Sequence, residues 1–372
     1  MKILIFGGTG AMGEELVPLL AETIDNTLVI TSRKKQEVSG NVRYIQGDAM
    51  NLDFVFDILR RDSYDVIVDF MLYSVGEFNA RYELLLKSCK QYLFFSSARV
   101  YAASDKLINE SSARLLDISK DQEFLSNGEY SLTKAKEEDI LAGSSFRNWV
   151  IIRPYKTYNS NRLQLGVMEK EDWIFRAIAG KKVVTLGDIL NLHTSLTSAK
   201  DTARILKRII GDLSMNGQTI QIANPESITW NDVIKIYFDC IERKYGRKMK
   251  VHTLNDTSDI ELLLGNHYRI KYDGLVDRKF DDKKVKSIMG EDFSWTSTKE
   301  ELTQCVQSYI EKVGNQRRIR NYKIEGGYDR VTGEIEPLKN MHGIRNIVDY
   351  WMYRTLSIST IQKLKKPAKK NQ

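Results

Sequence analysis

The stretch ILIFGGTGAMG, residues 3 to 13, joins a short apolar run to a glycine-rich loop. A run of large apolar residues that ends in glycine is typical of a strand buried in a parallel sheet. Gly7, Gly10 and Gly13 fit the spacing G-x-x-G-x-x-G, and starting from Gly8 instead gives G-x-G-x-x-G. With either spacing the backbone turns tightly and the next helix offers its N–H groups to a phosphate. The stretch therefore predicts a strand, a phosphate-binding turn and a helix, in that order.

Apolar runs of the same kind recur through the first half of the chain. They lie at residues 28 to 31, 66 to 71, 92 to 96 and 149 to 152, a further strand precedes Gly47, and another is expected at 218 to 223. Helix-length polar segments separate the runs, which is the pattern of parallel strands covered by helices on both faces. We therefore predict an α/β fold, a doubly wound (Rossmann) parallel sheet whose ligand crevice lies at the carboxyl ends of its strands.

The domain boundaries are expected where this pattern changes. We predict a dinucleotide-binding domain at residues 1 to 160, to which residues 194 to 223 return. Residues 161 to 193 and 224 to 313 would form a smaller mixed α/β lobe for the substrate, with helices at 170 to 179 and after Thr229. Residues 314 to 372 would form a basic C-terminal extension.

The basic charge of the chain is concentrated in that last segment. Of the 372 residues, 42% are hydrophobic and 28% are charged, as in soluble globular proteins. Residues 315 to 372 hold 13 of the 56 lysines and arginines but only 5 of the 49 acidic residues, so 43 basic and 44 acidic residues remain elsewhere. The net charge of +7 therefore belongs to the tail, and we expect no nucleic acid as a partner.

Cysteines, histidines and apolar segments exclude several classes of protein. Cys89, Cys240 and Cys305 are widely spaced, which indicates free thiols in a reducing compartment. The four histidines show no ligand spacing, so no metal site is expected. The N-terminal apolar run is too short for a signal peptide, and no apolar segment approaches membrane-spanning length. The sequence therefore predicts a cytoplasmic protein.

The residues after the second strand bear on the type of dinucleotide. An acidic residue at this place accepts a hydrogen bond from the ribose of NAD. This chain has Ser32, Arg33 and Lys34 instead, which can donate to a 2′-phosphate and neutralise it, so NADP (NADPH) is favoured. NAD stays the alternative, because an exposed basic turn can also lie beside an NAD site. After the third strand, Asp48 is either an adenine contact or a solvated turn residue.

Tyr130 and Lys134 lie four residues apart at the start of a predicted helix, a spacing that also fits plain helix surface. Beside a bound dinucleotide, the pair could take part in proton transfer. A phenol with a pKa of about 10 is a poor base, but a nearby ammonium and an oxidised nicotinamide both favour the phenolate. Tyr130 could then move a proton from a sugar hydroxyl while Lys134 holds the nicotinamide ribose. Ser97, at the end of a strand, either bonds the same oxygen or caps the next helix.

These motifs together resemble a known family. GGTGAMG, GD at 47 to 48, SSARVYA, YSLTK and IIRPYKTYN occur in the order and spacing of the extended short-chain dehydrogenase/reductase family, over roughly residues 1 to 312. That family includes nucleotide-sugar epimerases, dehydratases and reductases. The resemblance implies Ser97, Tyr130 and Lys134 as the catalytic set. It implies cofactor contacts at Gly7, Thr9, Gly10, Ala11, Met12, Gly13, Asp48, Ala49, Phe70, Met71, Lys134, Pro154 and Tyr155.

Departures from the family pattern narrow the reaction. The family's 4,6-dehydratases carry Thr-Asp-Glu where this chain has Ser97, Ala98 and Arg99, so two acid roles are missing and that chemistry is disfavoured. Bulky Phe70 and Met71 stand in VDFML at 68 to 72, where the family usually has a His followed by small residues, which affects the expected cofactor pose and redox direction.

Contacts with the substrate are less well marked in the sequence. Arg162 could clamp a diphosphate or lie on a surface loop. His193 and Thr194 could meet the sugar or base, or cap a helix.

The sequence thus predicts an NAD(P)-dependent nucleoside-diphosphate-sugar epimerase, expected to be a homodimer. The alternatives are an NADPH-dependent 4-keto nucleotide-sugar reductase and a non-catalytic member that senses nucleotides or binds RNA. An amphipathic helix is predicted near the C-terminus, with its apolar stripe docked on the body or on a partner subunit. Contact of residues 340 to 372 with an anionic membrane is the alternative. The stripe consists of Ile344, Ile347, Val348, Trp351 and Met352.

Overall fold

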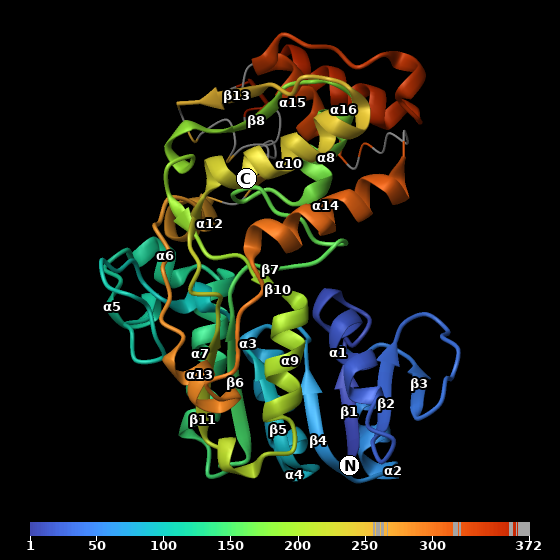
Figure 1. The fold of residues 1–372 in the computed structure, drawn as a ribbon, viewed down its shortest axis with the longest axis vertical. Coiled ribbons are helices and arrows are strands. Elements are labelled where there is room, and N and C mark those ends of the chain that lie inside the picture. The colour runs from blue at the N-terminus through green and yellow to red at the C-terminus, as the bar shows by residue number, and fades with distance from the viewer. Residues whose placement is uncertain are drawn as a thin grey trace, which may run out of the picture. The chain divides into compact units, whose positions relative to one another are not determined.

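The chain forms two structural units in the computed structural model (Figure 1). The structure describes residues 1–255, 257, 261, 264–265, 267–314, 319, 321–356, 360–361 and 363. The first unit comprises Met1–Asn161, Thr194–Ser227 and Asp277–Glu301. The second comprises Arg162–His193, Ile228–Val276 and Leu302–Gln372.

The first unit is built on a sheet of seven parallel strands in the order β11-β6-β5-β4-β1-β2-β3. The strands are β1 (Lys2–Phe6), β2 (Thr27–Ser32), β3 (Val42–Gln46), β4 (Tyr64–Asp69), β5 (Cys89–Phe95), β6 (Trp149–Pro154) and β11 (Gln218–Ile222). The chain runs outward from β1 to β3 and then crosses to β4 on the other side of β1. Ligands of doubly wound sheets bind at the carboxyl ends of the strands beside such a reversal. The predicted fold class is confirmed.

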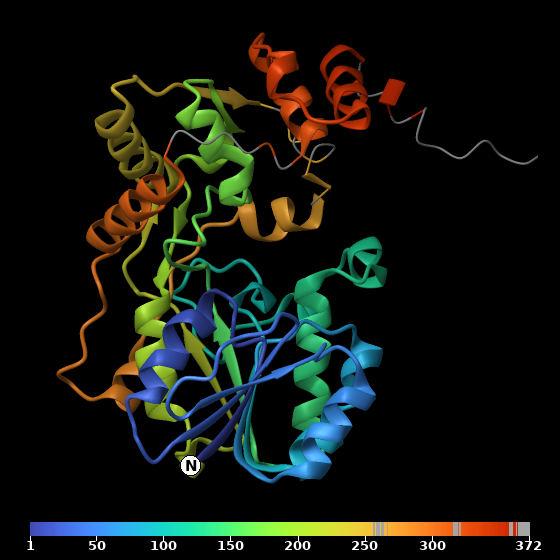
Figure 2. The same ribbon diagram turned by 90° about the vertical axis from the view of Figure 1, so that its right-hand side faces the viewer.

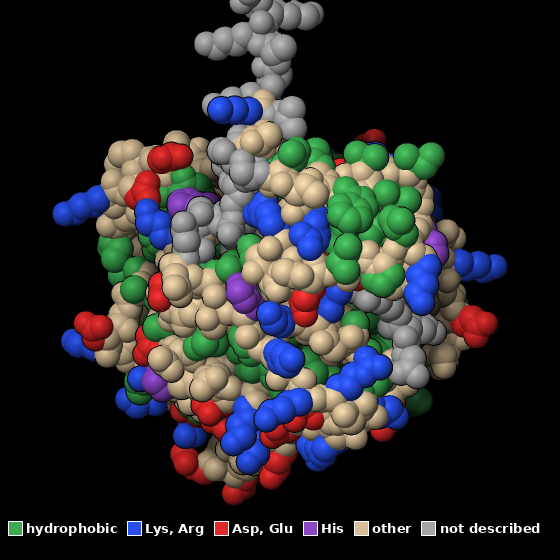
Figure 3. Space-filling view, turned by 90° about the horizontal axis from the view of Figure 1, so that it is seen from above, with side chains coloured by type: hydrophobic (Ala, Val, Ile, Leu, Met, Phe, Trp, Pro, Cys, Tyr) green, Lys and Arg blue, Asp and Glu red, His purple; other side chains and the backbone are tan. Residues whose placement is uncertain are grey.

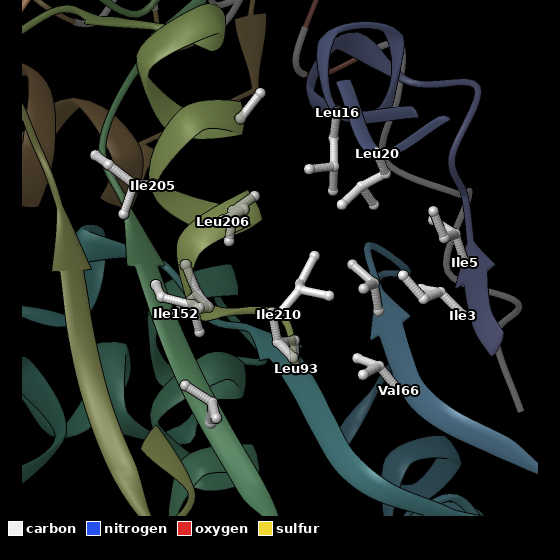
Figure 4. Packing of buried hydrophobic residues seen from close by; sticks show 14 of the residues in the cluster. Ile3, Ile5, Leu16, Leu20, Val66, Leu93, Ile152, Ile205, Leu206 and Ile210 are labelled. Atoms are coloured by element: carbon white, nitrogen blue, oxygen red, sulfur yellow. The ribbon is translucent and has the colours of Figure 1, made fainter. Parts of the chain in front are cut away.

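Helices cover both faces of this sheet, as Figure 2 shows. One face carries α1 (Ala11–Ala21) and α9 (Ala199–Ile209), and the other carries α2 (Leu52–Arg61), α3 (Val75–Asn79), α4 (Tyr82–Lys87) and α7 (Tyr130–Gly143). In β1, Ile3 and Ile5 face α1, where they pack in one cluster with Leu16 and Leu20 (Figure 4). Their neighbours Leu4 and Phe6 pack in the opposite cluster. Burial of both faces explains why the strands read as continuous apolar runs.

Short elements complete the first unit. They are η1 (Ala98–Val100), α5 (Leu115–Ile118), α6 (Gln122–Ser126), β7 (Thr157–Tyr158), β10 (Thr197–Ser198), η3 (Leu213–Met215) and α13 (Lys283–Met289). Asp277–Glu301 groups with this unit, although the sequence analysis assigned residues 224 to 313 to the substrate lobe. The reason is long-range pairing: Ile108 forms a bridge with Phe280, and the Lys284 Nζ donates to the Thr219 carbonyl at 2.6 Å.

The second unit mixes helices with short strands. It contains α8 (Lys170–Ile178), β8 (Val183–Leu186), η2 (Gly187–Ile189), β9 (His193–Thr194), β12 (Ile228–Thr229), α10 (Trp230–Tyr245), β13 (Val251–Leu254), α12 (His267–Arg269), the π-helical turn η4 (Ile270–Gly274), most of α14 (Thr298–Val313), α15 (Tyr322–Thr332), η5 (Leu338–Asn340) and α16 (Ile344–Thr355). The helix predicted after Thr229 is confirmed, because the Thr229 side chain caps α10 by accepting from the Asp232 N–H. The helix predicted at 170 to 179 corresponds to α8.

The C-terminal segment is part of the second unit and not a separate extension. Two basic side chains, Arg176 of α8 and Lys181 shortly before β8, are buried against it. Arg176 contacts Glu325 at 2.8 Å and Asp329 at 2.9 Å, and Lys181 contacts the same two carboxylates at 2.8 and 2.6 Å. Breaking one partner of such a buried ion pair leaves an uncompensated charge, so α15 is held firmly to this unit.

The apolar stripe predicted for docking is divided: Ile347 and Trp351 pack on the buried cluster of Tyr322, Met341 and Tyr350, whereas Ile344 and Val348 face outward. Ile344 is 82% exposed and Val348 is 56% exposed, whereas Tyr350 and Tyr353 on another face of α16 are buried. The Tyr350 hydroxyl donates to Asp329 at 2.7 Å. A Cβ atom on Gly326 would lie 2.3 Å from the Tyr350 carbonyl oxygen, so glycine there permits close approach of α15 to α16. Tyr350 and Tyr353, together with Ile347 and Trp351 of the predicted stripe, therefore form the docked face.

Candidate active site

The glycine loop after β1 has the geometry of a phosphate-binding turn. Gly7 has a φ of +71°, a conformation that suits glycine, and its carbonyl accepts from the Gly10 N–H at 3.1 Å. A Cβ atom on Gly13 would lie 2.1 Å from the Gly8 carbonyl oxygen, so α1 packs directly on the loop. No side chain caps the N-terminus of α1. Thr9 lies in this turn, and Ala11 and Met12 are the first residues of α1, so the predicted residues fit a pyrophosphate.

The end of β4 lies against this loop. A Cβ atom on Gly7 would be 3.2 Å from the Met71 sulfur and 3.4 Å from the Phe70 Cβ. The predicted strand at 66 to 71 ends at Asp69, so both bulky residues follow the strand. The Phe70 ring packs on Phe95 with 4.3 Å between centroids. Phe70 and Met71 therefore pack beside the glycine loop at the carboxyl ends of β1 and β4.

The ends of β2 and β3 carry the predicted adenosine contacts. Ser32 is buried and accepts from the Lys34 N–H at 3.3 Å, while the Arg33 and Lys34 side chains are exposed. Asp48 is exposed and accepts from the Met50 N–H at 3.0 Å, as a turn aspartate does. No acidic residue ends β2. Both predicted roles, phosphate binding by the basic turn and adenine binding by Asp48, stay predictions.

Arg81, which was not predicted as a site residue, holds the loop after Asp48. Its guanidinium is buried, donates to the carbonyls of Ala49 at 3.1 Å and Met50 at 3.0 Å, and lies 4.2 Å from the Tyr73 ring centroid. These partners are about thirty residues away along the chain, so no local spacing marks the interaction.

Ser97 and Tyr130 are linked through Arg99. The Ser97 hydroxyl is buried and accepts from the Arg99 N–H at 3.2 Å, which caps η1 and corresponds to the capping alternative. The Arg99 guanidinium lies 5.1 Å from the Tyr130 ring centroid and forms an ion pair with Glu129. These contacts bring the segment after β5 close to the start of α7. Arg99 and Glu129 were not predicted as site residues.

Tyr130 is the first residue of α7, as predicted. The Glu129 carboxylate caps the helix by accepting from the Ser131 N–H at 2.6 Å. Because Glu129 also holds Arg99, one carboxylate fixes both the helix start and the cation beside the Tyr130 ring. Tyr130 itself is half-buried.

Lys134 lies one helical turn after Tyr130, but its side chain is enclosed. Its Nζ is 2.9 Å from the Glu137 carboxylate and 4.6 Å from the Phe94 ring centroid, and the side chain is 1% exposed. Burial raises the pKa of Glu137, and the charge of Lys134 opposes that rise. The ammonium thus has a buried counter-charge that the sequence analysis missed, although an acid three residues after a lysine is a recognisable helix pair.

Asp69 adds a second buried acid near Lys134. Its carboxylate accepts from the Tyr92 hydroxyl at 2.8 Å and from the Met71 N–H at 3.0 Å. Burial raises the pKa of Asp69, while the hydrogen bonds and the charge of Lys134 oppose this. The acid in the apolar run VIVDFM was the sequence signal for this group.

Residues after β6 approach α1. Tyr155, which follows Pro154, is 1% exposed and packs on Phe280 with 4.8 Å between ring centroids, so a cofactor contact there would have to use its backbone. Asn159 was not predicted, yet its amide donates to the Ala11 carbonyl at 3.2 Å and to Glu14 at 3.3 Å. The segment therefore reaches the helix that follows the glycine loop.

The predicted substrate residues divide between the units. Arg162 and His193 belong to the second unit and Thr194 to the first. Burial alone would raise the pKa of Glu169, but Arg162, a hydrogen bond from Gln164 and Arg269 hold it below its usual value. His193 is half-buried, and the Thr194 hydroxyl is buried without a hydrogen bond among the described residues.

One cluster of acids, Glu325, Asp329 and Glu336, has carboxylates close enough to share a cation within the described residues. The Lys181 ammonium contacts each of them, at 2.8, 2.6 and 2.9 Å. The ammonium therefore takes the place that a metal ion would need.

Comparison with known proteins identifies the family. The family model for the NAD dependent epimerase/dehydratase family matches residues 3–223, more than half of the chain. The chain belongs to this family. The family resemblance predicted from the sequence is thereby confirmed.

Relatives of this epimerase/dehydratase family member include a curated protein and many solved structures. The chain is 25% identical over 248 residues to the chloroplast stem-loop binding protein of 41 kDa b from Arabidopsis thaliana, covering 63% of this chain and 61% of that protein. It thus spans less than two thirds of the relative's length.

Two enzyme structures share the fold. UDP-glucuronic acid 4-epimerase from Bacillus cereus, solved with UDP-glucuronic acid and NAD, aligns over 84% of this chain and 100% of that one, with a TM-score of 0.63 and 17% identity. dTDP-glucose 4,6-dehydratase from Bacillus anthracis, solved with NAD, aligns over 84% and 97%, with a TM-score of 0.61 and 16% identity.

Proposed function

We propose that the protein is an NAD(P)-dependent nucleoside-diphosphate-sugar epimerase. The observation that supports this most is that three predicted functional groups lie at the same edge of the first unit's sheet. The phosphate-binding turn follows β1, Met71 follows β4, and the Ser97–Arg99–Tyr130 group follows β5, a set of three neighbouring strands. Because the carboxyl ends of parallel strands share one edge, these groups can serve a single ligand.

The residues of the chain would then divide the work of proton transfer. When bound, the nicotinamide ring would accept a hydride from a sugar carbon and return it to the other face. Tyr130 would take the proton from the hydroxyl on that carbon and later give it back. The Ser97 hydroxyl accepts from a backbone N–H, so its own hydrogen can be donated to the same sugar oxygen. Lys134, paired with Glu137, would stabilise negative charge from within the fold.

The form of the cofactor is a finer proposal. Ser32, Arg33 and Lys34, with no acid at the end of β2, favour NADP. NAD is the alternative, and the two solved enzymes named above contain NAD.

For the substrate, the proposed contacts are Ser97, Tyr130, Arg162, His193 and Thr194. Support for Arg162 comes from Arg269, since both guanidinium groups act on Glu169 and two such groups suit a diphosphate. A homodimer is also proposed.

The experiment is to incubate the purified protein with a panel of UDP- and dTDP-sugars and to follow the products by NMR and the nicotinamide by absorbance. We expect one sugar to be converted to its epimer with no net change in nicotinamide absorbance. Tyr130→Phe should lower kcat by about 10²- to 10⁴-fold, because the proton acceptor is lost. Tyr82→Phe, at a solvent-exposed hydroxyl on α4, is the control and should leave kcat unchanged. Full turnover by Tyr130→Phe would contradict the assigned role.

Two alternatives have distinct outcomes in the same study. Net oxidation of NADPH with a 4-keto sugar would identify a reductase that uses the same residues. The name of the Arabidopsis relative favours testing the other, an RNA-binding member. Tight binding of stem-loop RNA, with no turnover of any sugar, would replace the epimerase proposal.

A further inference from the structure

Helix α16 presents an aliphatic stripe to solvent. Ile344 is 82% exposed, Val348 one turn later is 56% exposed, and Met352 continues the line half-buried. Residues four apart lie one above the other on a helix, so these side chains form a continuous strip. Scattered exposed apolar residues need no explanation, but a contiguous strip with basic neighbours marks an interaction surface.

The acidic side chains of the same segment point away from this surface. Glu325, Asp329 and Glu336 are buried, with exposed fractions of 7%, 0% and 1%. Each contacts the Lys181 ammonium. Three of the five acidic residues of the segment therefore form internal ion pairs, while Asp349 on α16 forms a partly exposed pair with Lys323.

The basic side chains are left outside. Lys339, Arg345 and Lys363 are exposed, and Arg345 directly follows Ile344 on α16. The sequence after residue 363 adds four more lysines, which lie outside the described residues. In Figure 3, hydrophobic side chains gather on the side where α15 and α16 lie in Figure 1, with lysine and arginine side chains around them. We call Lys339, Ile344, Arg345, Val348 and Met352 the α16 surface.

We propose that the α16 surface binds an anionic phospholipid membrane peripherally. Aliphatic side chains on a helix enter the boundary between headgroups and acyl chains, and basic side chains are attracted to acidic lipids. Both elements are present here: the aliphatic strip lies on α16, and the exposed basic side chains are Arg345 on the same helix and Lys339 in η5. No helix among the described residues is long and apolar enough to cross a membrane.

Other occupants fit the surface less well. A second copy of the chain would bring Arg345 and Lys339 of both copies together, and like charges repel across an interface. Nucleic acid would be attracted by the lysines, but phosphate contacts make no use of Ile344 or Val348. Of these three occupants, only an acidic lipid surface uses both kinds of side chain.

The test is sedimentation of the full-length protein with vesicles of phosphatidylcholine alone or mixed with phosphatidylserine. We expect binding to the mixed vesicles only, weakening as salt rises. The variant Ile344→Glu/Val348→Glu should lose at least about tenfold in affinity, because two carboxylates replace the aliphatic strip. Ile24→Glu changes a side chain in the first unit that is 84% exposed, and should bind like wild type.

Several outcomes would overturn the proposal. The first is that wild-type protein stays in the supernatant when vesicles containing phosphatidylserine are sedimented. The second is that the double variant binds these vesicles as well as wild type does. Because both substituted side chains are exposed, circular dichroism and thermal unfolding should show that the double variant folds. A dimer in analytical ultracentrifugation that the double variant dissociates would assign the surface to a second copy. RNA binding that survives the double variant, without vesicle binding, would assign the basic residues to nucleic acid.

Discussion

Gly13 tolerates no side chain, because a Cβ atom would lie 2.1 Å from the Gly8 carbonyl oxygen. Gly13→Ala must therefore move α1 away from the turn that it supports. We expect a loss of about 1–3 kcal/mol in the free energy of unfolding and a weaker dinucleotide affinity. Urea unfolding and nicotinamide fluorescence titration measure the two effects. Gly143→Ala, where no atom lies within 4 Å of the new Cβ, should change neither.

A substitution at Arg33 tests the proposed preference for NADP. If its exposed guanidinium contacts the 2′-phosphate, Arg33→Ala should weaken NADPH binding about tenfold or more and leave NADH binding unchanged. Arg61→Ala, at an exposed arginine on α2, is the control for a general change in charge. Equal losses for both dinucleotides in Arg33→Ala would remove the phosphate contact and favour NAD.

Residues of the site differ in how well the sequence reveals them. The glycines and Tyr130 act through spacing along one turn or one helix, so their pattern is visible in a single sequence. Arg81 and Asn159 act on backbone carbonyls far away in the chain, which leaves no local pattern. Glu137 was recoverable in principle, but an acid three residues from a lysine is usually read as exposed helix surface.

At the scale of elements, the cap of α7 controls the position of Tyr130. Glu129→Ala should lower the free energy of unfolding by about 1–2 kcal/mol and lower kcat, because Arg99 loses the carboxylate that holds it beside the Tyr130 ring. Asp121→Ala removes the cap of α6, where the carboxylate accepts from the Phe124 N–H. We expect a similar loss of stability there with kcat retained. If both variants kept wild-type kcat, the cap would have no role in positioning Tyr130.

The sequence predicts helices and strands well where both of their faces are buried. It predicts their orientation less well where one face is exposed. The strands of the first unit are buried on both faces, so their apolar runs mark them directly. In α16 the predicted stripe indicated only part of the docked face: Ile347 and Trp351 pack inward, but Ile344 and Val348 are exposed. Tyr350 and Tyr353 complete the docked face, and the hydroxyl of Tyr350 donates to a buried carboxylate. A hydrophobic stripe cannot indicate orientation when hydrogen-bonded aromatic residues compete for the interior.

At the scale of the whole molecule, Asp329 anchors the C-terminal segment. It is fully buried and contacts Arg176 and Lys181, so Asp329→Asn should cost about 3–5 kcal/mol by leaving buried cations uncompensated. Urea unfolding followed by tryptophan fluorescence measures this. Asp349→Asn breaks a partly exposed pair with Lys323 at 3.7 Å, and should cost about 1 kcal/mol or less.

Asp329 also makes the stability of the protein depend on pH. Burial alone would raise the pKa of Asp329, but Arg176, Lys181 and Tyr350 hold it below its usual value. A carboxylate whose pKa is lower in the folded state contributes stability above its unfolded pKa of about 4. That contribution is lost as pH falls through the folded value. Wild-type stability should therefore decline at acid pH more steeply than that of Asp329→Asn, and parallel pH profiles would contradict this.

The grouping of distant segments was beyond the reach of the sequence. Asp277–Glu301 joins the first unit through pairing such as Ile108 with Phe280, contacts that depend on the completed sheet. The C-terminal segment joins the second unit through charges whose partners lie about 150 residues earlier. Charge counts showed that the segment is basic, but not that Glu325, Asp329 and Glu336 are buried.

Those inward-facing acids have a consequence for how the protein is made. Arg176 and Lys181 leave the ribosome long before Glu325 and Asp329, and until then their charges have no buried counterpart. The second unit can therefore close only when synthesis has passed those acids. Nascent chains that stall earlier should be open to cellular proteases, and a premature stop codon between the two groups should yield little surviving protein.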